Sequence, residues 1–430
     1  MTPARVPIPR RGVDYRGTIV LAPMIRSGEC PSRLLALKYG ADLVWGPETI
    51  DKALIGTTRR QNPITDTVDF TRYSSNGVKN PAIDIDQRES LIYRLHPQRE
   101  GRKLVYQIGT SNPVTAVEAA KLVAADVAGI DVNAGCPKPF STLGGMGAAL
   151  LKTPDKLCSI LRALVAEVGQ PFEIGISVKI RILDTAAETE ALVKSLCATG
   201  ITGLTVHCRT TPMRPRERAI RDQLRMVAEV CREAGVACLM NGDVTSREDA
   251  LQLISEYGVD GAMIATAAET NPSVFRTEAE GGKVSWEEVV KVYVRTALEV
   301  DNRWGNTKYL LGQMIPGKSP KYKAMTTTKS YSGLVKALGY EDELGVLAKD
   351  VDQRLEIGDF DKPKLTKAER KAANNAAKKD SPASNTIDAS AQPAVGKKRT
   401  ADIAQLDMPP DVARERGPGT VSEMASTLVT

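Results

Sequence analysis

The sequence of 430 residues has few of the features that would make a metal protein, a secreted protein or a membrane protein. It has only two histidines, His96 and His207, which lie far apart and beside no Cys-x-x-Cys pair, so the usual ligands of a zinc site are missing. The seven cysteines show no paired short spacings, no signal-like stretch opens the chain, and no apolar run is long enough to cross a bilayer. We therefore expect a soluble protein of a reducing compartment, cytoplasmic or also nuclear, without metal or structural disulfides.

Positive charge is concentrated near the C-terminus. The formal net charge is +6, and ten basic residues face three acidic ones between Lys362 and Thr400, which leaves about −1 for the rest of the chain. Such a segment is typical of an arm that binds RNA or DNA, or of a solvated tail that only keeps a protein soluble; charge alone favours neither. The residues after Lys362 are also too poor in apolar side chains to offset the entropy of ordering, so we predict a disordered tail.

Eight short apolar segments alternate with segments of helical spacing along the first two thirds of the chain. This alternation is typical of a closed (β/α)8 barrel, the TIM barrel. The alternative is an open doubly wound sheet, whose dinucleotide form needs Gly-x-Gly-x-x-Gly after the first strand; residues 22–26 are Ala-Pro-Met-Ile-Arg instead. We therefore predict an α/β barrel. Its strands begin at Thr18, Ala41, Lys103, Val127, Ile174, Gly203, Ala237 and Gly261.

The pattern changes in two places. A long segment from Thr49 to Arg102 breaks the alternation, and we expect it to be functional or to carry small elements of its own. After the last strand, helical spacing continues without strands through Trp286–Trp304, Lys321–Leu338 and Asp342–Ile357. We therefore predict three parts: the barrel at 1–283, a small all-helical domain at 284–360 and the disordered basic tail at 361–430.

Cys136 stands where an apolar strand, Val127 to Asn133, runs into a loop. Gly135 and Pro137 on either side prevent a regular helix or strand from continuing, so the thiol is presented on a turn. A free cysteine is more often a small buried apolar residue, but this turn favours a chemical role.

Other polar side chains also follow predicted strands, at the barrel end where chemistry gathers. Lys179 lies among aliphatic residues and needs a negative partner, either an internal Asp or Glu or, as we favour, an anionic ligand. The turn Asn241-Gly242-Asp243 is suited to a phosphate, because glycine lets backbone N–H groups come close. With Gln107 and His207, these residues describe a planar anionic cofactor with a phosphate at one end, and flavin mononucleotide (FMN) meets that description.

Six short motifs together resemble the signature blocks of the tRNA-dihydrouridine synthases, in that family's order. The stretch Lys138-Pro139-Phe140-Ser141 is most similar to the eukaryotic subgroup that acts on position 20 of the tRNA D-loop. The motifs are Ala22-Pro23-Met24, Gln107-Ile108-Gly109, Asp131 to Pro137, Val178 to Arg181, Val206 to Thr210 and Asn241 to Val244.

The resemblance implies an FMN-binding barrel followed by a helical tRNA-binding domain, acting as a monomer on a D-loop uridine. NADPH would reduce the flavin, the reduced flavin would give hydride to C6 of the uracil, and Cys136 would protonate C5. A free thiol has a pKa of about 8.5 and is suited to donate, provided Lys179 and His207 do not drive it to thiolate. The target base must leave its stack, which is easiest in a loop. The implied substrate contacts are Asn133, Lys138 and Arg209; the implied FMN contacts are Ala22, Pro23, Met24, Gln107, Lys179, His207, Asn241, Gly242, Asp243, Ala265 and Thr266.

Two departures from the family pattern keep alternatives open. The family usually places an arginine for the cofactor phosphate where this chain has Thr266, and a hydroxyl brings no charge. Animal members of the subgroup also carry a double-stranded RNA-binding domain after the helices, which this sequence does not show. One competing interpretation, motivated by Thr266, is an RNA-binding relative without cofactor. The other is an FMN barrel acting on free pyrimidines, which the helical domain and the basic arm argue against.

Overall fold

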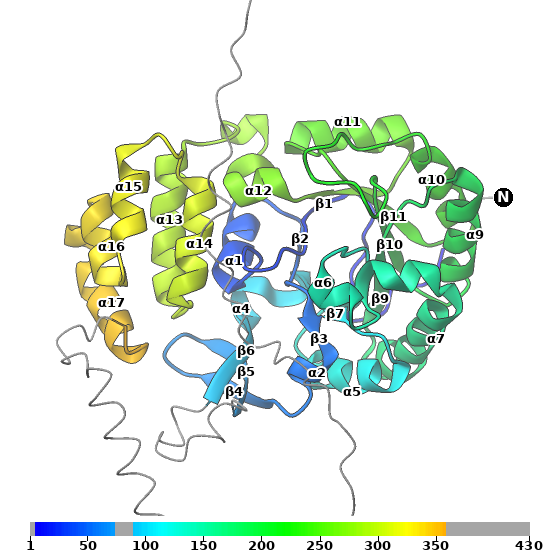
Figure 1. Ribbon diagram of the computed structural model, residues 1–430, viewed down its shortest axis with the longest axis horizontal. Coiled ribbons are helices and arrows are strands. Elements are labelled where there is room, and N and C mark those ends of the chain that lie inside the picture. The colour runs from blue at the N-terminus through cyan, green and yellow to red at the C-terminus, as the bar shows by residue number, and fades with distance from the viewer. Residues whose placement is uncertain (1–4, 74–88, 358–430) are drawn as a thin grey trace, which may run out of the picture. The chain divides into compact units, whose positions relative to one another are not determined.

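The fold is a parallel β-barrel followed by a group of helices, seen in a computed structural model that describes residues 5–73 and 89–357 (Figure 1). The sheet order is β2-β1-β12-β11-β10-β9-β8-β7, and pairing of β2 with β7 closes it. The predicted barrel is confirmed, and each predicted strand is present within two residues of its expected start. The eight strands are β1 (Thr18–Leu21), β2 (Leu43–Trp45), β7 (Leu104–Gly109), β8 (Gly129–Ala134), β9 (Gly175–Arg181), β10 (Gly203–His207), β11 (Ala237–Asn241) and β12 (Gly261–Ile264).

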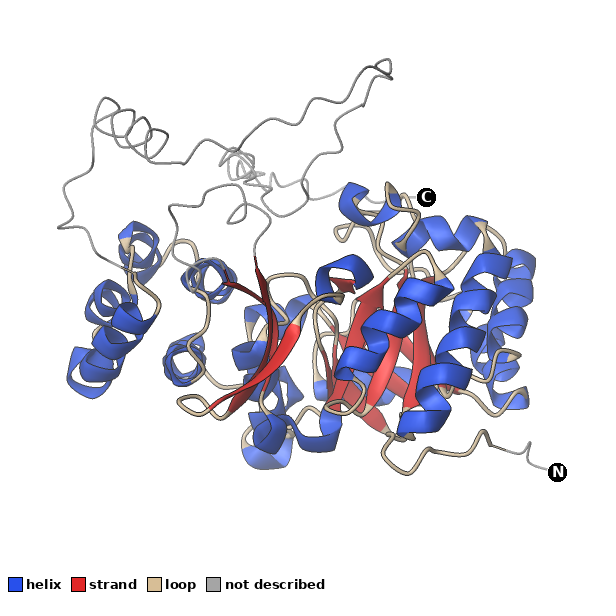
Figure 2. Cartoon of the chain, turned by 90° about the horizontal axis from the view of Figure 1, so that it is seen from below, coloured by secondary structure: helices blue, strands red, loops and turns tan. Residues whose placement is uncertain are grey.

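Helices surround the barrel and bury its outer face in one large apolar cluster (Figure 2). Local signals in the sequence set their ends. In α11, for example, the hydroxyl of Ser246 accepts a hydrogen bond from the backbone N–H of Asp249, and Gly258 ends the helix in the left-handed region with φ 68°. The main barrel helices are α1 (Cys30–Lys38), α5 (Pro113–Val123), α7 (Pro154–Leu164), α9 (Ala186–Cys197), α10 (Leu224–Glu233) and α11 (Arg247–Tyr257).

The long segment between the second and third barrel strands carries elements of its own, as expected. A two-residue strand, β3 (Thr49–Ile50), pairs with β7, and a separate antiparallel sheet has the order β4-β5-β6. The elements of this segment are β3, α2 (Asp51–Leu54), β4 (Thr58–Asn62), β5 (Thr67–Tyr73), β6 (Glu89–Leu95) and α4 (Pro97–Glu100).

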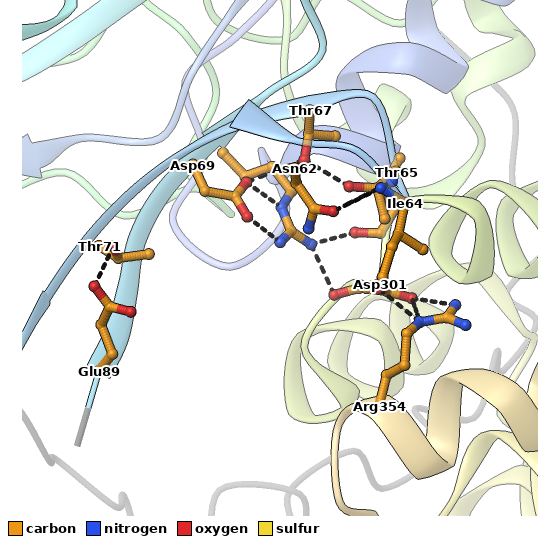
Figure 3. Close-up of polar contacts among 11 residues, drawn as sticks. Asn62, Ile64, Thr65, Thr67, Asp69, Thr71, Glu89, Asp301 and Arg354 are labelled. Carbon is orange, nitrogen blue, oxygen red and sulfur yellow. Dashed lines mark hydrogen bonds and ion pairs between the residues drawn. The ribbon is translucent and has the colours of Figure 1, made fainter. Parts of the chain in front are cut away.

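This small sheet is joined to the C-terminal helices by a polar network (Figure 3). Arg94 of β6 pairs with Asp69 of β5 and also donates to the backbone carbonyl of Asp301, 3.0 Å away. The carboxylate of Asp301 in turn pairs with Arg354 at 2.7 Å. These contacts connect the β4-β5-β6 sheet, which is inserted between two barrel strands, to the C-terminal helices.

The C-terminal helices have their own apolar core, to which Leu35 and Tyr39 from the region of α1 contribute. The predicted helix Trp286–Trp304 ends early, because Asp301 takes a left-handed conformation with φ 44°, and the helix that follows was not predicted. The predicted helix Lys321–Leu338 is two helices, since Ser330 caps a new one by accepting from the N–H of Gly333. The helices are α13 (Trp286–Glu299), α14 (Trp304–Met314), α15 (Pro320–Thr327), α16 (Tyr331–Leu338) and α17 (Glu341–Arg354).

The domain boundary at residue 283/284 stays a prediction, and the predicted tail at 361–430 lies outside the described residues. Within the described ranges, no helix combines the length and the apolar character needed to cross a membrane.

Candidate active site

The candidate site lies at the end of the barrel where all eight parallel strands finish. Registers place the predicted residues of neighbouring strands side by side: Asn133 pairs with Lys179, and His207 pairs with both Arg181 and Asn241. The structure therefore brings together side chains that are more than one hundred residues apart in the sequence.

Cys136 lies on a turn after β8, as the sequence predicted. The side-chain oxygen of Asn133 accepts hydrogen bonds from the backbone N–H groups of Gly135 (2.9 Å) and Cys136 (3.0 Å). Gly147 packs against the other side, where a Cβ atom would come within 2.5 Å of the Cys136 carbonyl oxygen. Cys136 is partly exposed, whereas the other six cysteines are buried. The turn thus presents the most accessible thiol of the protein in a fixed position.

The hydrogen bonds of Asn133 limit how its side chain could contact a substrate. Its side chain is 7% exposed, and its oxygen already serves the turn. The predicted contact with the uracil stays a prediction, and it would fall to the amide nitrogen. Lys138, by contrast, is exposed at the start of α6 (Pro139–Thr142) and is accessible to a large substrate.

Glu48, in the connection between β2 and β3, is a site residue that the sequence reasoning missed. One carboxyl oxygen accepts a hydrogen bond from the Ser141 hydroxyl of α6 at 3.1 Å, and the other is buried with no hydrogen-bond partner among the described residues. Burial raises the pKa of this carboxyl to about 7, and Ser141, Asn133 and Cys136 lie beside it. An acidic residue just after a barrel strand was the available signal, but no motif marks it.

The Cys136 thiol keeps its proton in this setting. Burial raises its pKa above the ordinary value, and the neighbouring Glu48 raises it further. Hydrogen bonding from the Lys138 backbone and the Ser141 side chain acts in the opposite direction without reversing the shift. The thiol is therefore mainly protonated at neutral pH.

A polar layer crosses the inside of the barrel below this turn. Gln107 donates to one carboxyl oxygen of Asp131 at 2.8 Å, and Ser177 donates to the other at 2.7 Å. Burial raises the pKa of Asp131 to about 6. Asp131 therefore orients the predicted flavin contact Gln107.

Lys179 lies next to this layer on β9. Burial, together with the charge of Arg181, lowers its pKa to about 8, while Asp131 acts the other way. Among the described residues, Asp131 is the carboxylate that acts on its ammonium, and it does so through its charge. Lys179 is partly buried, so both alternatives from the sequence, an internal carboxylate such as Asp131 and an anionic ligand, stay predictions.

His207 is uncharged. Burial lowers its pKa well below the ordinary range, and the cations of Lys179, Arg181 and Arg209 lower it further. Its Nε2 atom lies 3.1 Å from a guanidinium nitrogen of Arg209. It can therefore offer a neutral imidazole edge to a ligand and does not drive Cys136 to thiolate.

Arg209 and Asp243 form an ion pair with one another, and each also makes hydrogen bonds to backbone groups. Arg209 is 4% exposed, pairs with Asp243, and donates to the carbonyl oxygens of Glu217 (2.7 Å) and Pro215 (3.1 Å). The Asp243 carboxylate also accepts from the N–H of Ala219 at 2.7 Å. The substrate contact predicted for Arg209 and the cofactor contact predicted for Asp243 stay predictions, and in this structure both side chains order the loop after β10.

The turns after the last two barrel strands are the predicted phosphate cradle, and the first of them is tightly built. Asn241 donates to the carbonyl oxygen of Met263 at 2.9 Å, and Gly242 follows with φ 121°. A Cβ atom there would approach the side chain of His207 to 3.3 Å, so only glycine fits without strain. The other predicted FMN contacts lie at the same end of the barrel: Ala22, Pro23 and Met24 directly after β1, and Ala265 and the exposed Thr266 directly after β12.

FMN fits this set of residues. The ammonium of Lys179 suits an anionic ring, and the glycine turn at Gly242 suits a phosphate. Thr266 brings no charge to this cradle, so backbone N–H groups would carry more of the phosphate binding.

Comparison with known proteins agrees with this site. A model of the dihydrouridine synthase family (Dus) matches residues 20–353. The tRNA-dihydrouridine(20) synthase (NAD(P)+) of Schizosaccharomyces pombe is 49% identical over 76% of this chain and 66% of its own length. The protein of that name from Saccharomyces cerevisiae is 46% identical over 74% of this chain and 82% of its own length. A tRNA-dihydrouridine(20a/20b) synthase of Saccharomyces cerevisiae is 26% identical over 62% of this chain and 64% of its own length. With the barrel and its thiol in place, this match means that the chain belongs to the dihydrouridine synthase family.

Proposed function

We propose that the protein reduces a uridine of the tRNA D-loop, at position 20, to 5,6-dihydrouridine. The observation that carries the proposal is the family match over residues 20–353, which includes the partly exposed Cys136 at the end of β8. Two relatives that are 46% and 49% identical bear the name of this activity with NAD(P)+. NADPH is the electron donor and FMN the flavin in this proposal.

The residues that would hold FMN are those at the strand ends. When bound, FMN would supply the hydride for C6 of the uracil. Lys179 would neutralise negative charge on the ring, and Gln107, fixed by Asp131, would address its polar edge. The turn at Gly242 would approach the phosphate with its backbone.

Cys136 would protonate C5 of the uracil. Its thiol is protonated at neutral pH, and the Asn133 turn holds it at the accessible end of the barrel. The proton leaves the sulfur and forms the new C–H bond, which leaves a thiolate that must take up a proton before the next turnover. Lys138 and other exposed basic groups would contact the tRNA backbone.

The experiment is a reconstitution with the full-length protein, FMN and NADPH, with unmodified tRNA and free uridine as parallel substrates. We expect dihydrouridine at position 20 of the tRNA and little reduction of free uridine. Equal reduction of free uridine would support the alternative of a pyrimidine reductase. A purified protein that binds no flavin would support the alternative of an RNA-binding relative. A monomeric state and a cytoplasmic or also nuclear location remain part of the proposal, to be tested separately.

A further inference from the structure

The loop after β1 holds an exposed arginine in an unusual backbone conformation. Arg26 lies two residues after the predicted flavin contact Met24 and takes the left-handed conformation, with φ 68°. Residues other than glycine seldom adopt this conformation, and those that do often lie at functional sites. The backbone N–H of Gly28 donates to the carbonyl oxygen of Met24 at 2.7 Å and closes the turn. The loop therefore presents the Arg26 side chain at the mouth of the barrel.

The Arg26 side chain is stacked on an aromatic ring of the C-terminal helices. Its guanidinium lies over the ring of Tyr309 in α14, 4.4 Å from the ring centre. The side-chain amide of Asn306, also in α14, donates to the carboxyl of Glu29 at 2.9 Å. Two contacts thus join the same loop to the same helix and fix where the arginine stands.

A third contact joins this loop to α12 (Thr266–Thr270), which begins directly after β12. The hydroxyl of Ser27 donates to the carboxylate of Glu269 in this helix. Since β1 and β12 are neighbouring strands of the barrel, the loop lies beside the predicted phosphate cradle. The pair Arg26–Tyr309 is therefore part of the rim of the predicted flavin site.

An arginine stacked on an aromatic ring is suited to single-stranded RNA. Stacking uses the face of the planar guanidinium, whereas its N–H groups lie in the plane and can bind a phosphate. Arg26 is exposed and Tyr309 is partly exposed, so a large anionic substrate can reach both. A base that leaves its stack to enter the site brings its flanking phosphates to the rim.

We propose that Arg26, positioned on Tyr309, binds a backbone phosphate of the tRNA next to the target uridine. The inference rests on the proposed function and adds a substrate contact to it. Arg209 is less suited to this contact, because it is 4% exposed and paired with Asp243. A phosphate contact fixes the position of the RNA and carries no base information, so Arg26 would position the loop without selecting its sequence.

The test measures binding of end-labelled, unmodified tRNA to the full-length protein by fluorescence anisotropy, at several salt concentrations, with excess FMN and without NADPH. For Arg26→Ala we expect the Kd to rise about 10-fold at low salt. The slope of log Kd against log salt concentration should fall by about 0.7, the contribution of one phosphate of a single strand. A residue that only joined the barrel to the helices would not change this slope.

Two further variants complete the experiment. Arg26→Gly removes the same side chain and accepts the left-handed backbone without strain, so it should match Arg26→Ala. Arg225→Ala is the matched control, since Arg225 is also exposed and lies over a tyrosine ring, that of Tyr257, at 5.4 Å between α10 and α11. It should leave both the Kd and its salt dependence unchanged.

Parental tRNA affinity and salt slope in folded Arg26→Ala would overturn the proposal, and so would an equal loss in Arg225→Ala. A loss that Arg26→Gly does not share would trace to a distorted loop and would also overturn it. Weaker binding of FMN with parental tRNA affinity would assign the guanidinium to the cofactor phosphate instead. The assay needs no turnover: if tRNA affinity falls as expected in a protein that forms no dihydrouridine, the proposed function fails and the RNA contact stands.

Discussion

Arg181 donates from Nε to the carbonyl oxygen of Gly135 at 2.7 Å, and so joins β9 to the turn that carries Cys136. Its Nη1 atom also donates to the carbonyl oxygen of Thr210 at 2.8 Å, in the loop after β10. One buried guanidinium therefore sets the distance between two loops at the mouth of the barrel. The forked geometry is specific to arginine, because a lysine ammonium carries all its donors on a single atom.

The first prediction follows from this double contact. Arg181→Lys should leave one carbonyl without its donor and loosen the Cys136 turn. Misplacement of a reacting group by about 1 Å can cost about 100-fold in rate, so we expect a fall of 10- to 100-fold in single-turnover dihydrouridine formation. The measurement is a rapid-quench time course with excess enzyme over tRNA.

The control for this variant is the melting temperature of the protein and its flavin content. A parental rate in a protein with normal flavin content would mean that Arg181 has no part in positioning the thiol.

The second prediction concerns Cys136 itself. Cys136→Ala removes the proton donor but leaves Lys179 and the turn at Gly242 in place. We therefore expect FMN to stay bound and to be reduced by NADPH, while dihydrouridine formation is nearly abolished. Flavin absorbance follows the first half of the reaction, and dihydrouridine analysis of the tRNA follows the second. Modification at the parental rate would show that another group protonates C5.

The third prediction is a pH dependence of flavin binding that Lys179 causes. Its pKa is lowered to about 8 in the absence of ligand, so the positive charge is present below that pH and is lost as the pH rises through it. An anionic ligand should bind more weakly above about pH 8, and its binding should raise the pKa of Lys179. We expect the Kd for FMN, measured by quenching of flavin fluorescence, to increase across this range.

Lys179→Met is the matched variant, because it keeps the length of the side chain without the charge. Hydrogen bonds to charged groups contribute about 1.5 to 3 kcal/mol, so the Kd should rise by about 10- to 100-fold and lose most of its pH dependence. A variant with the same pH dependence as the parent would assign that dependence to another group.

The elements that the sequence predicted correctly share a physical cause. Barrel strands are buried on both faces, so their sequences are short continuous apolar runs, as in Val127 to Asn133. The alternation of these runs with helical segments can be recognised without any tertiary information. Cys136 was predictable for a similar reason, since Gly135 and Pro137 shape its turn locally.

Other features depend on contacts between distant segments. Glu48 becomes a site residue only because barrel closure brings the connection after β2 against α6, a contact that no local pattern encodes. The break between α13 and α14 depends on Asp301, whose conformation is held by Arg354 from the far end of the helical region. The sequence indicated that the segment from Thr49 to Arg102 could carry elements of its own, but not that they form a sheet, because its first strand, β4, is mostly exposed and polar.

The last prediction concerns stability at the junction of α1 and α4. Arg33 and Glu100 form a buried ion pair, with each side chain 1% exposed and Nε to Oε1 at 2.6 Å. Arg33 also donates to the carbonyl oxygens of Gly28 and Arg94, so the pair connects α1 to the insertion sheet. Replacing one partner leaves the other charge buried without compensation, which typically costs about 3 to 5 kcal/mol.

Glu100→Gln should therefore lower the free energy of unfolding by about that amount, measured by urea denaturation followed by circular dichroism. The double variant Arg33→Met, Glu100→Leu removes both charges. Its free energy of unfolding should fall by less than that of Glu100→Gln alone, because no unpaired charge remains. An exposed pair, Lys194 and Glu190, serves as the comparison, and Glu190→Gln there should change stability by less than about 1 kcal/mol. A double variant that is less stable than the single one would mean that the packing and the carbonyl contacts of Arg33 matter more than its charge.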